Sequence, residues 1–175
     1  MLVERGLADS RTQAQALIRA GKVFAGEQRI DKPGTPVSKE IPLEVRGKEH
    51  PWVSRGGMKL DHALGHFDID VTGAVALDVG ASTGGFTDVL FSRGAAKVFA
   101  VDVGYGQLNW KLRQDDRVVV LERQNARHLT EDHIPDPVDI VVCDASFIGL
   151  RTVLATPLQF AAPGAHLAAL IKPQF

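Results

Sequence analysis

The residues of this 175-residue chain with the clearest capacity for chemistry lie in a glycine-rich turn, ALDVGASTGGFTD, at residues 76–88. A turn of this kind, between an apolar run and a helical pattern, typically cradles a ligand. Gly80 and Gly85 have the spacing of a phosphate-binding P-loop, but Phe86 stands where that loop needs its lysine. Ser82 takes the place of the second glycine in a dinucleotide-binding fingerprint. The turn therefore favours neither a nucleoside triphosphate nor a dinucleotide.

Carboxylates at the ends of two apolar runs indicate a cationic ligand instead. Asp78 would attract a cation, and S-adenosylmethionine carries an ammonium and a sulfonium group. Asp102, 22 residues after Gly80, could accept hydrogen bonds from both ribose hydroxyls. Asn125 and Ala126, in a loop after the next apolar run, would lie against the adenine. The predicted cofactor-binding residues are Asp78, Gly80, Ser82, Thr83, Gly84, Gly85, Phe86, Asp102, Asn125, Ala126 and Asp144.

Five apolar runs from residue 74 onward predict a parallel sheet around this turn. They are AVALDV, KVFAVDV, VVVLE, VDIVVCD and AHLAALIK, and helical stretches such as GGFTDVLFSRG and IGLRTVLATPLQFAAPG separate several of them. Apolar strands that alternate with helices are typical of an α/β sheet covered on both faces, which binds ligands at the carboxyl ends of its strands. A preceding helix, RGGMKLDHALGHF, has Leu60, Leu64 and Phe67 spaced to face the core.

A basic unit precedes this region. Residues 1–60 hold 11 Lys and Arg against 7 Asp and Glu, whereas residues 61–175 hold 9 against 14. Ser10 and Gln13 form a capping box for a helix that Gly21 ends, and KVFAG and IPLEV predict short strands. The charge suggests a polyanionic partner, although an ordinary solvated surface would give the same pattern. Arg5, Arg11, Arg19, Lys22 and Arg29 could line one basic surface for phosphates, and the predicted RNA-binding residues are Arg5, Arg11, Arg19, Lys22 and Arg55.

These patterns predict a small α+β module at residues 1–45, a linker at 46–54 and an α/β domain at 55–175. The stretch ERGLADSRTQAQALIRAGKVFAGE resembles the RNA-binding module named after ribosomal protein S-four. The motifs WVSRGGMKL, LDVGASTGGFTD, VFAVDVGYGQL, CDASFI and LIKPQF are similar to those of the TlyA, or hemolysin A, family. That resemblance implies a Rossmann-like, FtsJ-related methyltransferase domain that uses S-adenosylmethionine to methylate ribose 2′-hydroxyls of ribosomal RNA.

The resemblance also implies a Lys-Asp-Lys-Glu catalytic tetrad, of which Lys59, Asp144 and Lys172 are present. Transfer to a ribose hydroxyl requires a weakly acidic oxygen to become nucleophilic and to align with the methyl group. Lys172 is the expected base, because a nearby cation and partial burial favour a neutral lysine. Asp144 would orient Lys172 and the donor, and Lys59 would hold the substrate. The family motif continues KPQFE beyond Phe175, so we expect the methyltransferase domain to be incomplete at its C-terminus.

Two other functions remain open at this stage. An RNA-binding protein with an inactive methyltransferase domain would explain the missing glutamate, although the intact glycine turn opposes it. A membrane-active hemolysin is disfavoured, because no apolar run reaches the length of a membrane span and no signal-peptide pattern is present. One cysteine, Cys143, fits a reducing cytoplasm, which is the expected location.

Weaker signals disfavour other chemistries. DASF stands where an amine methyltransferase typically carries an Asn/Asp-Pro-Pro-aromatic motif, and Cys143 is expected to be a buried structural thiol rather than a nucleophile. His62 and His66 have the spacing of a helical metal pair, but the sequence offers no third ligand, so no metal is expected.

Overall fold

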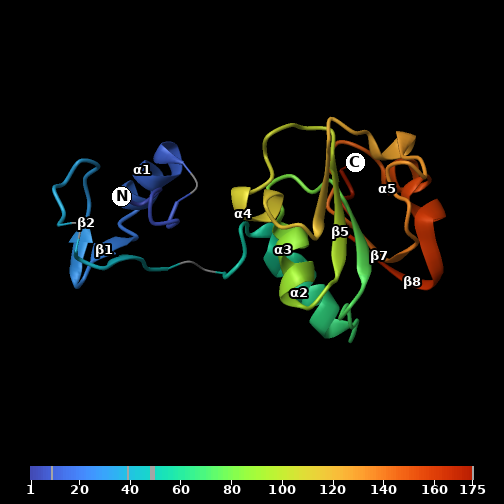
Figure 1. Cartoon of the computed structure of the whole chain (residues 1–175), viewed down its shortest axis with the longest axis horizontal. Helices are drawn as coiled ribbons and strands as arrows, with labels where there is room; N and C mark the ends of the chain where they lie inside the picture. The colour runs from blue at the N-terminus through green and yellow to red at the C-terminus, as the bar shows by residue number, and fades with distance from the viewer. Residues whose placement is uncertain (9, 39, 48–49, 175) are drawn as a thin grey trace. The chain divides into compact units, whose positions relative to one another are not determined.

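The computed structural model describes residues 1–8, 10–38, 40–47 and 50–174, which form two compact units, Met1–Pro51 and Trp52–Phe175 (Figure 1). The first unit contains α1 (Arg11–Arg19) and three strands, β1 (Val23–Ala25), β2 (Gln28–Ile30) and β3 (Leu43–Val45). These strands form an antiparallel sheet in the order β2-β1-β3. This unit is the small α+β module that the sequence predicts.

Local signals in the sequence account for most of the first unit. Ser10 is the N-cap of α1, and its hydroxyl accepts a hydrogen bond from Gln13 N at 3.1 Å. Strand β2 is not evident from the sequence pattern, because EQRI is short and Ile30 is its one apolar residue. A two-residue turn at Gly26 and Glu27 creates this strand, and Gly26 has the φ of +60° that such turns favour.

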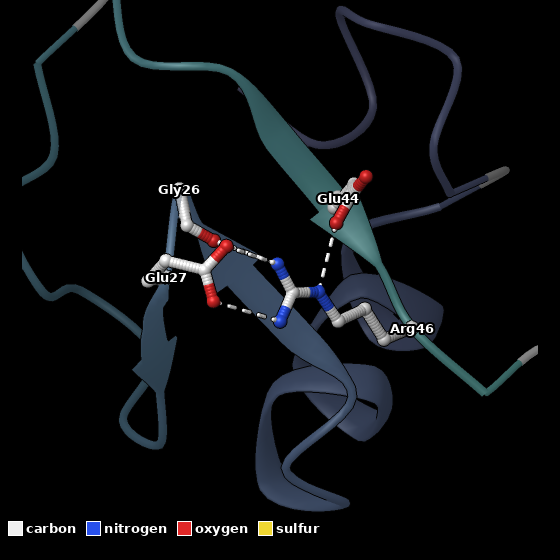
Figure 2. Close-up of polar contacts among 4 residues, drawn as sticks. All are labelled: Gly26, Glu27, Glu44 and Arg46. Carbon is white, nitrogen blue, oxygen red and sulfur yellow. Dashed lines mark hydrogen bonds and ion pairs between the residues drawn. The ribbon is translucent and has the colours of Figure 1, made fainter.

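Arg46 ties the end of β3 to that turn. Figure 2 shows its guanidinium between the side chains of Glu44 and Glu27. Nε donates to Glu44 at 2.8 Å, and Nη2 donates to Glu27 and to the carbonyl of Gly26, both at 3.2 Å. The guanidinium also lies 4.4 Å from the centre of the Phe24 ring. Arg46 is therefore occupied within its own unit.

The second unit is a five-stranded parallel sheet with helices on both faces (Figure 1). The sheet order is β6-β5-β4-β7-β8, and the Rossmann-like fold class that the sequence predicts is confirmed. Its elements in chain order are α2 (Gly56–His66), β4 (Val75–Val79), α3 (Gly85–Ser92), β5 (Lys97–Asp102), α4 (Trp110–Arg113), β6 (Val118–Glu122), η1 (Ala126–His128), β7 (Val138–Cys143), α5 (Leu150–Leu154), η2 (Pro157–Phe160) and β8 (Ala161–Ala169).

The chain runs outward from β4 to β6 and then returns to β7 on the other side of β4. This reversal is the topological switch point at which such sheets bind ligands. Two apolar clusters hold the layers together. Leu60 and Leu64 of α2 pack with Leu90 of α3 on one face, and Val153 and Leu154 of α5 pack on the other.

Three details differ from the sequence prediction. Phe67 does not face the core: it is 68% exposed, because α2 ends at His66 and Phe67 is its C-cap residue. The helix expected across residues 148–164 is shorter, since α5 and η2 end by Phe160 and Ala161 already begins β8. The short helix α4 was not predicted. No helix within the described residues is long and apolar enough to cross a membrane.

Candidate active site

A pocket of about 670 Å³ opens at the carboxyl ends of the parallel strands, beside the switch point. Its volume suits a small organic ligand. The walls come from the β4–α3 turn, the ends of β5 and β7, the start of η1 and the start of α2. Of the predicted site residues, the pocket is lined by Lys59, Gly80, Ser82, Thr83, Gly85, Phe86, Asp102, Asn125, Ala126, Asp144 and Lys172.

The glycine turn is shaped by close approaches that exclude a side chain. Gly80 has φ +84°, and a Cβ there would lie 3.1 Å from the Cα of Ala145. A Cβ on Gly85 would lie 2.2 Å from Ser54 Oγ. Gly84, with φ +93°, does not line the pocket: its Cβ would collide with Leu112 of α4 at 2.3 Å. The turn therefore presents backbone to the pocket on one side and packs against α4 on the other.

Asp78 lies beneath the pocket rather than on its wall. Its side chain is completely buried and does not line the pocket, because alternation along β4 turns it, like Ala76, toward the α2–α3 face. The hydroxyl of Thr87 donates to Oδ2 at 2.7 Å, whereas Oδ1 has no hydrogen-bond partner among the described residues. Burial raises the pKa of Asp78 to about 7, with Asp144 and Asp102 adding to the rise and the Thr87 hydrogen bond opposing it.

This placement changes how Asp78 could serve a ligand. The sequence predicts direct attraction of a cation in the pocket, but the buried carboxyl has no exposed surface to offer. Its structural link to the pocket is Thr87 in the first turn of α3, directly after the glycine turn. A part for Asp78 in ligand binding thus remains a proposal, and it would be an indirect one.

Asp102 is held in place at the end of β5 by two backbone N–H groups. Oδ2 accepts from Ser82 N at 2.8 Å, and Oδ1 accepts from Gly104 N at 2.7 Å. Each carboxylate oxygen keeps further acceptor capacity toward the pocket. Asn125, after the neighbouring strand β6, caps η1 by accepting from Arg127 N at 3.1 Å, and Ala126 follows it. These residues form one end of the pocket, with a fixed acceptor at Asp102.

Two lysines meet one aspartate at the other end of the pocket. Lys172 Nζ lies 2.6 Å from Asp144 Oδ1 and donates to the main-chain oxygen of Asp144 at 2.9 Å. Lys59 Nζ approaches Asp144 Oδ2 at 3.5 Å. Asp144 follows β7, Lys172 follows the neighbouring β8, and Lys59 lies in the first turns of α2. The structure therefore brings together the three residues that the sequence assigns to catalysis.

Several pocket residues were not identified from the sequence. Ser146 accepts a hydrogen bond from Lys172 Nζ at 2.8 Å, and Gln107 accepts one from Ser82 Oγ at 3.2 Å. Ser54 and Gln124 also line the pocket. Ser146 lies within the motif CDASFI and Gln107 within VFAVDVGYGQL, so both belong to stretches that the sequence marks as functional. Their residue types and spacing, however, do not distinguish these two residues from their neighbours in the motifs.

The predicted RNA-binding residues divide between the two units. Arg5, Arg11, Arg19 and Lys22 belong to the first, and Arg55 is the N-cap of α2 in the second. Arg11 and Arg19 lie exposed on α1. Arg5 Nη1 donates to the carbonyl of Ile41 at 2.7 Å, and Lys22 Nζ donates to that of Gly47 at 3.2 Å. RNA contact at these residues remains a prediction.

Two other features that could carry chemistry are the histidine pair on α2 and the single cysteine. The rings of His62 and His66 lie exposed on α2 with their centres 5.8 Å apart. Within the described residues, no group of three or more histidine, cysteine or carboxylate side chains is arranged to hold a metal ion. Cys143 is buried in β7, and burial raises the pKa of its thiol, which disfavours the thiolate that a nucleophile needs.

Comparison with known proteins relates this geometry to a family. The FtsJ-like methyltransferase family model matches residues 52–175, and the S4 domain model matches residues 1–40. The 16S/23S rRNA (cytidine-2′-O)-methyltransferase TlyA of Mycobacterium tuberculosis is 56% identical over 99% of this chain and 65% of that protein. Hemolysin A of Brachyspira hyodysenteriae is 39% identical over 97% of this chain and 71% of that protein.

A solved structure agrees with these matches. The protein named "Putative hemolysin from Streptococcus thermophilus" is 41% identical and superposes with a TM-score of 0.72, covering 99% of this chain and 64% of that one. The chain thus spans less than two thirds of the length of the Mycobacterium and Streptococcus proteins. The resemblance seen in the sequence motifs is confirmed: the chain belongs to the FtsJ-like methyltransferase family, among the TlyA and hemolysin A proteins.

Proposed function

We propose that the protein transfers a methyl group from S-adenosylmethionine to a ribose 2′-hydroxyl of ribosomal RNA. The observation that carries the proposal is the cluster of Lys172, Asp144 and Lys59 at one end of the glycine-turn pocket. A pocket with a fixed carboxylate at one end and a lysine–aspartate cluster at the other suits a donor that must meet an acceptor oxygen. The family and the names of the relatives support the same reaction class.

The pocket fits the proposed donor in shape and in chemistry. The glycine turn presents the backbone of Gly80 and Gly85 to the pocket, at positions where a Cβ would collide with Ala145 or Ser54. Asp102 offers acceptors for ribose hydroxyls, while Phe86 and Ile148 add apolar surface. S-Adenosylmethionine would supply an electrophilic methyl group when bound. The chain's own contribution is then to position the acceptor oxygen and to remove its proton.

The lysine–aspartate cluster has the charge that this second task requires. Lys59 and Lys172 share one carboxylate, so the cluster carries excess positive charge next to the pocket once both lysines are protonated. Positive charge favours the negative charge that develops on a ribose oxygen as its proton leaves. In our proposal the lone pair of the neutral Lys172 amine accepts that proton, and the ammonium group so formed is held by Asp144. Asp144 and Ser146 fix the position of the Lys172 Nζ, and the more exposed Lys59 holds the RNA.

The first unit supports RNA as the substrate. It matches the S4 domain, and its helix α1 exposes Arg11 and Arg19. Basic side chains on a small module give RNA affinity through phosphate contacts, which need no base-specific chemistry. We propose that Arg5, Arg11, Arg19, Lys22 and Arg55 contribute such contacts. With ribosomal RNA as the substrate, we propose that the enzyme acts in the cytoplasm.

The test uses methyl-labelled S-adenosylmethionine and purified ribosomal subunits whose RNA lacks the modification. After incubation the RNA is digested to nucleosides, and label is expected in a 2′-O-methylated nucleoside. Label on a base would overturn the proposed acceptor. Binding of the subunits without any transfer would favour an RNA-binding protein with an inactive methyltransferase domain. The variant Lys172→Ala, assayed in parallel, ties the label to the proposed site.

A further inference from the structure

We propose that Gln107 is a specificity-determining residue of the donor site, and that its amide nitrogen donates a hydrogen bond to a ribose hydroxyl beside Asp102. This proposal rests on the proposed function, because it requires an adenosyl donor in the pocket. Gln107 lines the pocket from the loop between β5 and α4. Neither the sequence motifs nor the family match assigns it a role.

The loop that carries Gln107 is fixed at several points. Leu108, the next residue, is buried against Ala81 and Leu112. Asn109 N donates to Thr83 O at 3.1 Å, which joins the loop to the glycine turn. Gly106 N donates to Glu122 at 2.9 Å on the other side. These contacts hold the backbone at Gln107 in one conformation before a ligand binds. A side chain that determines ligand specificity needs such a fixed backbone.

The side chain of Gln107 is oriented by a neighbour. Ser82 Oγ donates to Oε1 at 3.2 Å, so the acceptor half of the amide is engaged by the glycine turn. The donor half of the amide, Nε2, is not used by this hydrogen bond and lies beside Gly104. The backbone N–H of the same serine donates to Asp102 Oδ2 at 2.8 Å. Ser82 thus holds both groups, the amide and the carboxylate, at one end of the pocket.

Gly104 shows how closely these two groups converge. A Cβ placed on Gly104 would lie 2.6 Å from Gln107 Nε2 and 3.0 Å from Asp102 Oδ1. Both atoms therefore lie within 3.0 Å of one point beside the Gly104 Cα, and a side chain at residue 104 would press on both of them. Gly104 has no positive φ, so the absence of a side chain, rather than backbone strain, is what its glycine provides.

The convergence provides two complementary hydrogen-bonding groups. Asp102 can only accept, and each of its oxygens already takes one backbone N–H. The hydroxyls of a ribose diol can each donate and accept. The Asp102 carboxylate would accept hydrogen bonds from the diol, and the Gln107 amide would donate one to a diol oxygen. Together they would recognise the diol both as a donor and as an acceptor. A site built to bond a hydroxyl rejects the analogue that lacks it, because buried polar groups lose their partner.

The test measures binding of S-adenosylhomocysteine by isothermal titration calorimetry to the 175-residue chain. Gln107→Ala removes the amide, whereas Gly104→Ala keeps it but displaces it by the new methyl group. Each variant is expected to bind about three- to tenfold more weakly, the worth of one hydrogen bond. The double variant should lose less affinity than the sum of the two single losses, since Gln107→Ala removes the amide that the new methyl group displaces. Gln114→Ala, an exposed glutamine outside the pocket, is the matched control.

Deoxy analogues identify the atom that is contacted. With 2′-deoxy- and 3′-deoxy-S-adenosylhomocysteine, the loss caused by Gln107→Ala should disappear for the analogue that lacks the contacted hydroxyl. An undiminished loss with both analogues would overturn the assignment to the diol, and so would wild-type affinity in Gln107→Ala. A wild-type chain that does not bind S-adenosylhomocysteine at all would instead refute the proposed function itself. Melting curves for every variant separate lost binding from lost folding.

Discussion

The hydroxyl of Thr87 donates to Asp78 Oδ2 at 2.7 Å, and both side chains are completely buried directly beneath the glycine turn. The second carboxyl oxygen has no hydrogen-bond partner among the described residues. An ionised carboxylate in such a position is costly, because one neutral hydrogen bond does not replace its hydration. This cost is the physical origin of the raised pKa of Asp78. It makes the stability of the fold beneath the glycine turn depend on pH.

Stability should fall as the pH rises through the window set by this group. The folded pKa of Asp78 is about 7, whereas an unfolded aspartate titrates near 3.9, so between these values the folded state binds the extra proton. The unfolding free energy therefore decreases with rising pH across that window, by at most about 4 kcal/mol. Asp78→Asn should remove this component of the slope. Urea unfolding from pH 4.5 to 8 measures it.

Exposed carboxylates provide the control for that experiment. Asp116→Asn removes an acidic group from the surface of the same unit and should leave the slope of the wild type in place. If Asp78→Asn and the wild type show the same dependence on pH, the proton is not held at Asp78. The dependence of the unfolding free energy on pH would then come from titratable groups other than Asp78.

The parallel sheet could be predicted because its strands are continuous apolar runs with helices between them. The same logic places the glycine turn, Asp102, Asp144 and Lys172 at one end of the sheet, since carboxyl ends of neighbouring parallel strands meet there. Short elements escaped prediction. Strand β2 has one buried residue, and α4 has four residues. Neither is long enough to show the alternation of apolar and polar residues that identifies a strand or a helix.

Side-chain direction was harder to predict than position. Asp78 was correctly located at a strand end, but whether a terminal carboxylate meets the pocket or the helix layer depends on which face of β4 it occupies. A fully apolar strand hides that alternation, because both of its faces are buried. Gln107 and Ser146 were missed for a related reason, since their roles come from contacts with Ser82 and Lys172 that lie far away in the sequence.

Gly84 should be intolerant of any side chain, for two separable reasons. Its φ of +93° disfavours an L-residue by about 1–2 kcal/mol, and its Cβ would meet Leu112 at 2.3 Å, adding about 1–3 kcal/mol of overpacking. Gly106 is a matched control, because it has φ +71° but open space around it. Gly84→Ala should therefore lower the unfolding free energy by about 2–4 kcal/mol and Gly106→Ala by about 1–2 kcal/mol in urea titrations. Equal losses would show that Leu112 moves aside freely.

Lys172→Ala should separate catalysis from binding. Removing the proposed base should slow single-turnover methyl transfer by about 10²–10⁴-fold, the usual contribution of a positioned proton acceptor. Affinity for S-adenosylhomocysteine should change little, because Lys172 contacts Asp144 and Ser146 rather than the end of the pocket near Asp102. Lys111→Ala, on the exposed surface of α4, controls for loss of positive charge. Full activity in Lys172→Ala would exclude it as the base.

Arginines of the first unit should differ in their effect on RNA affinity according to whether a carboxylate already holds them. Arg29 Nε lies 2.9 Å from Asp31, so its charge is largely offset within the unit. Arg11 and Arg19 have no ion pair among the residues that the structure describes, and both are exposed on α1. Replacing either by alanine should weaken binding to ribosomal RNA and reduce the slope of log affinity against log salt by about 0.7–0.9, one phosphate contact each. Arg29→Ala should leave that slope nearly unchanged. If all three variants behave alike in filter-binding titrations across a salt series, RNA senses only the net charge of the unit, and the α1 surface is not its contact.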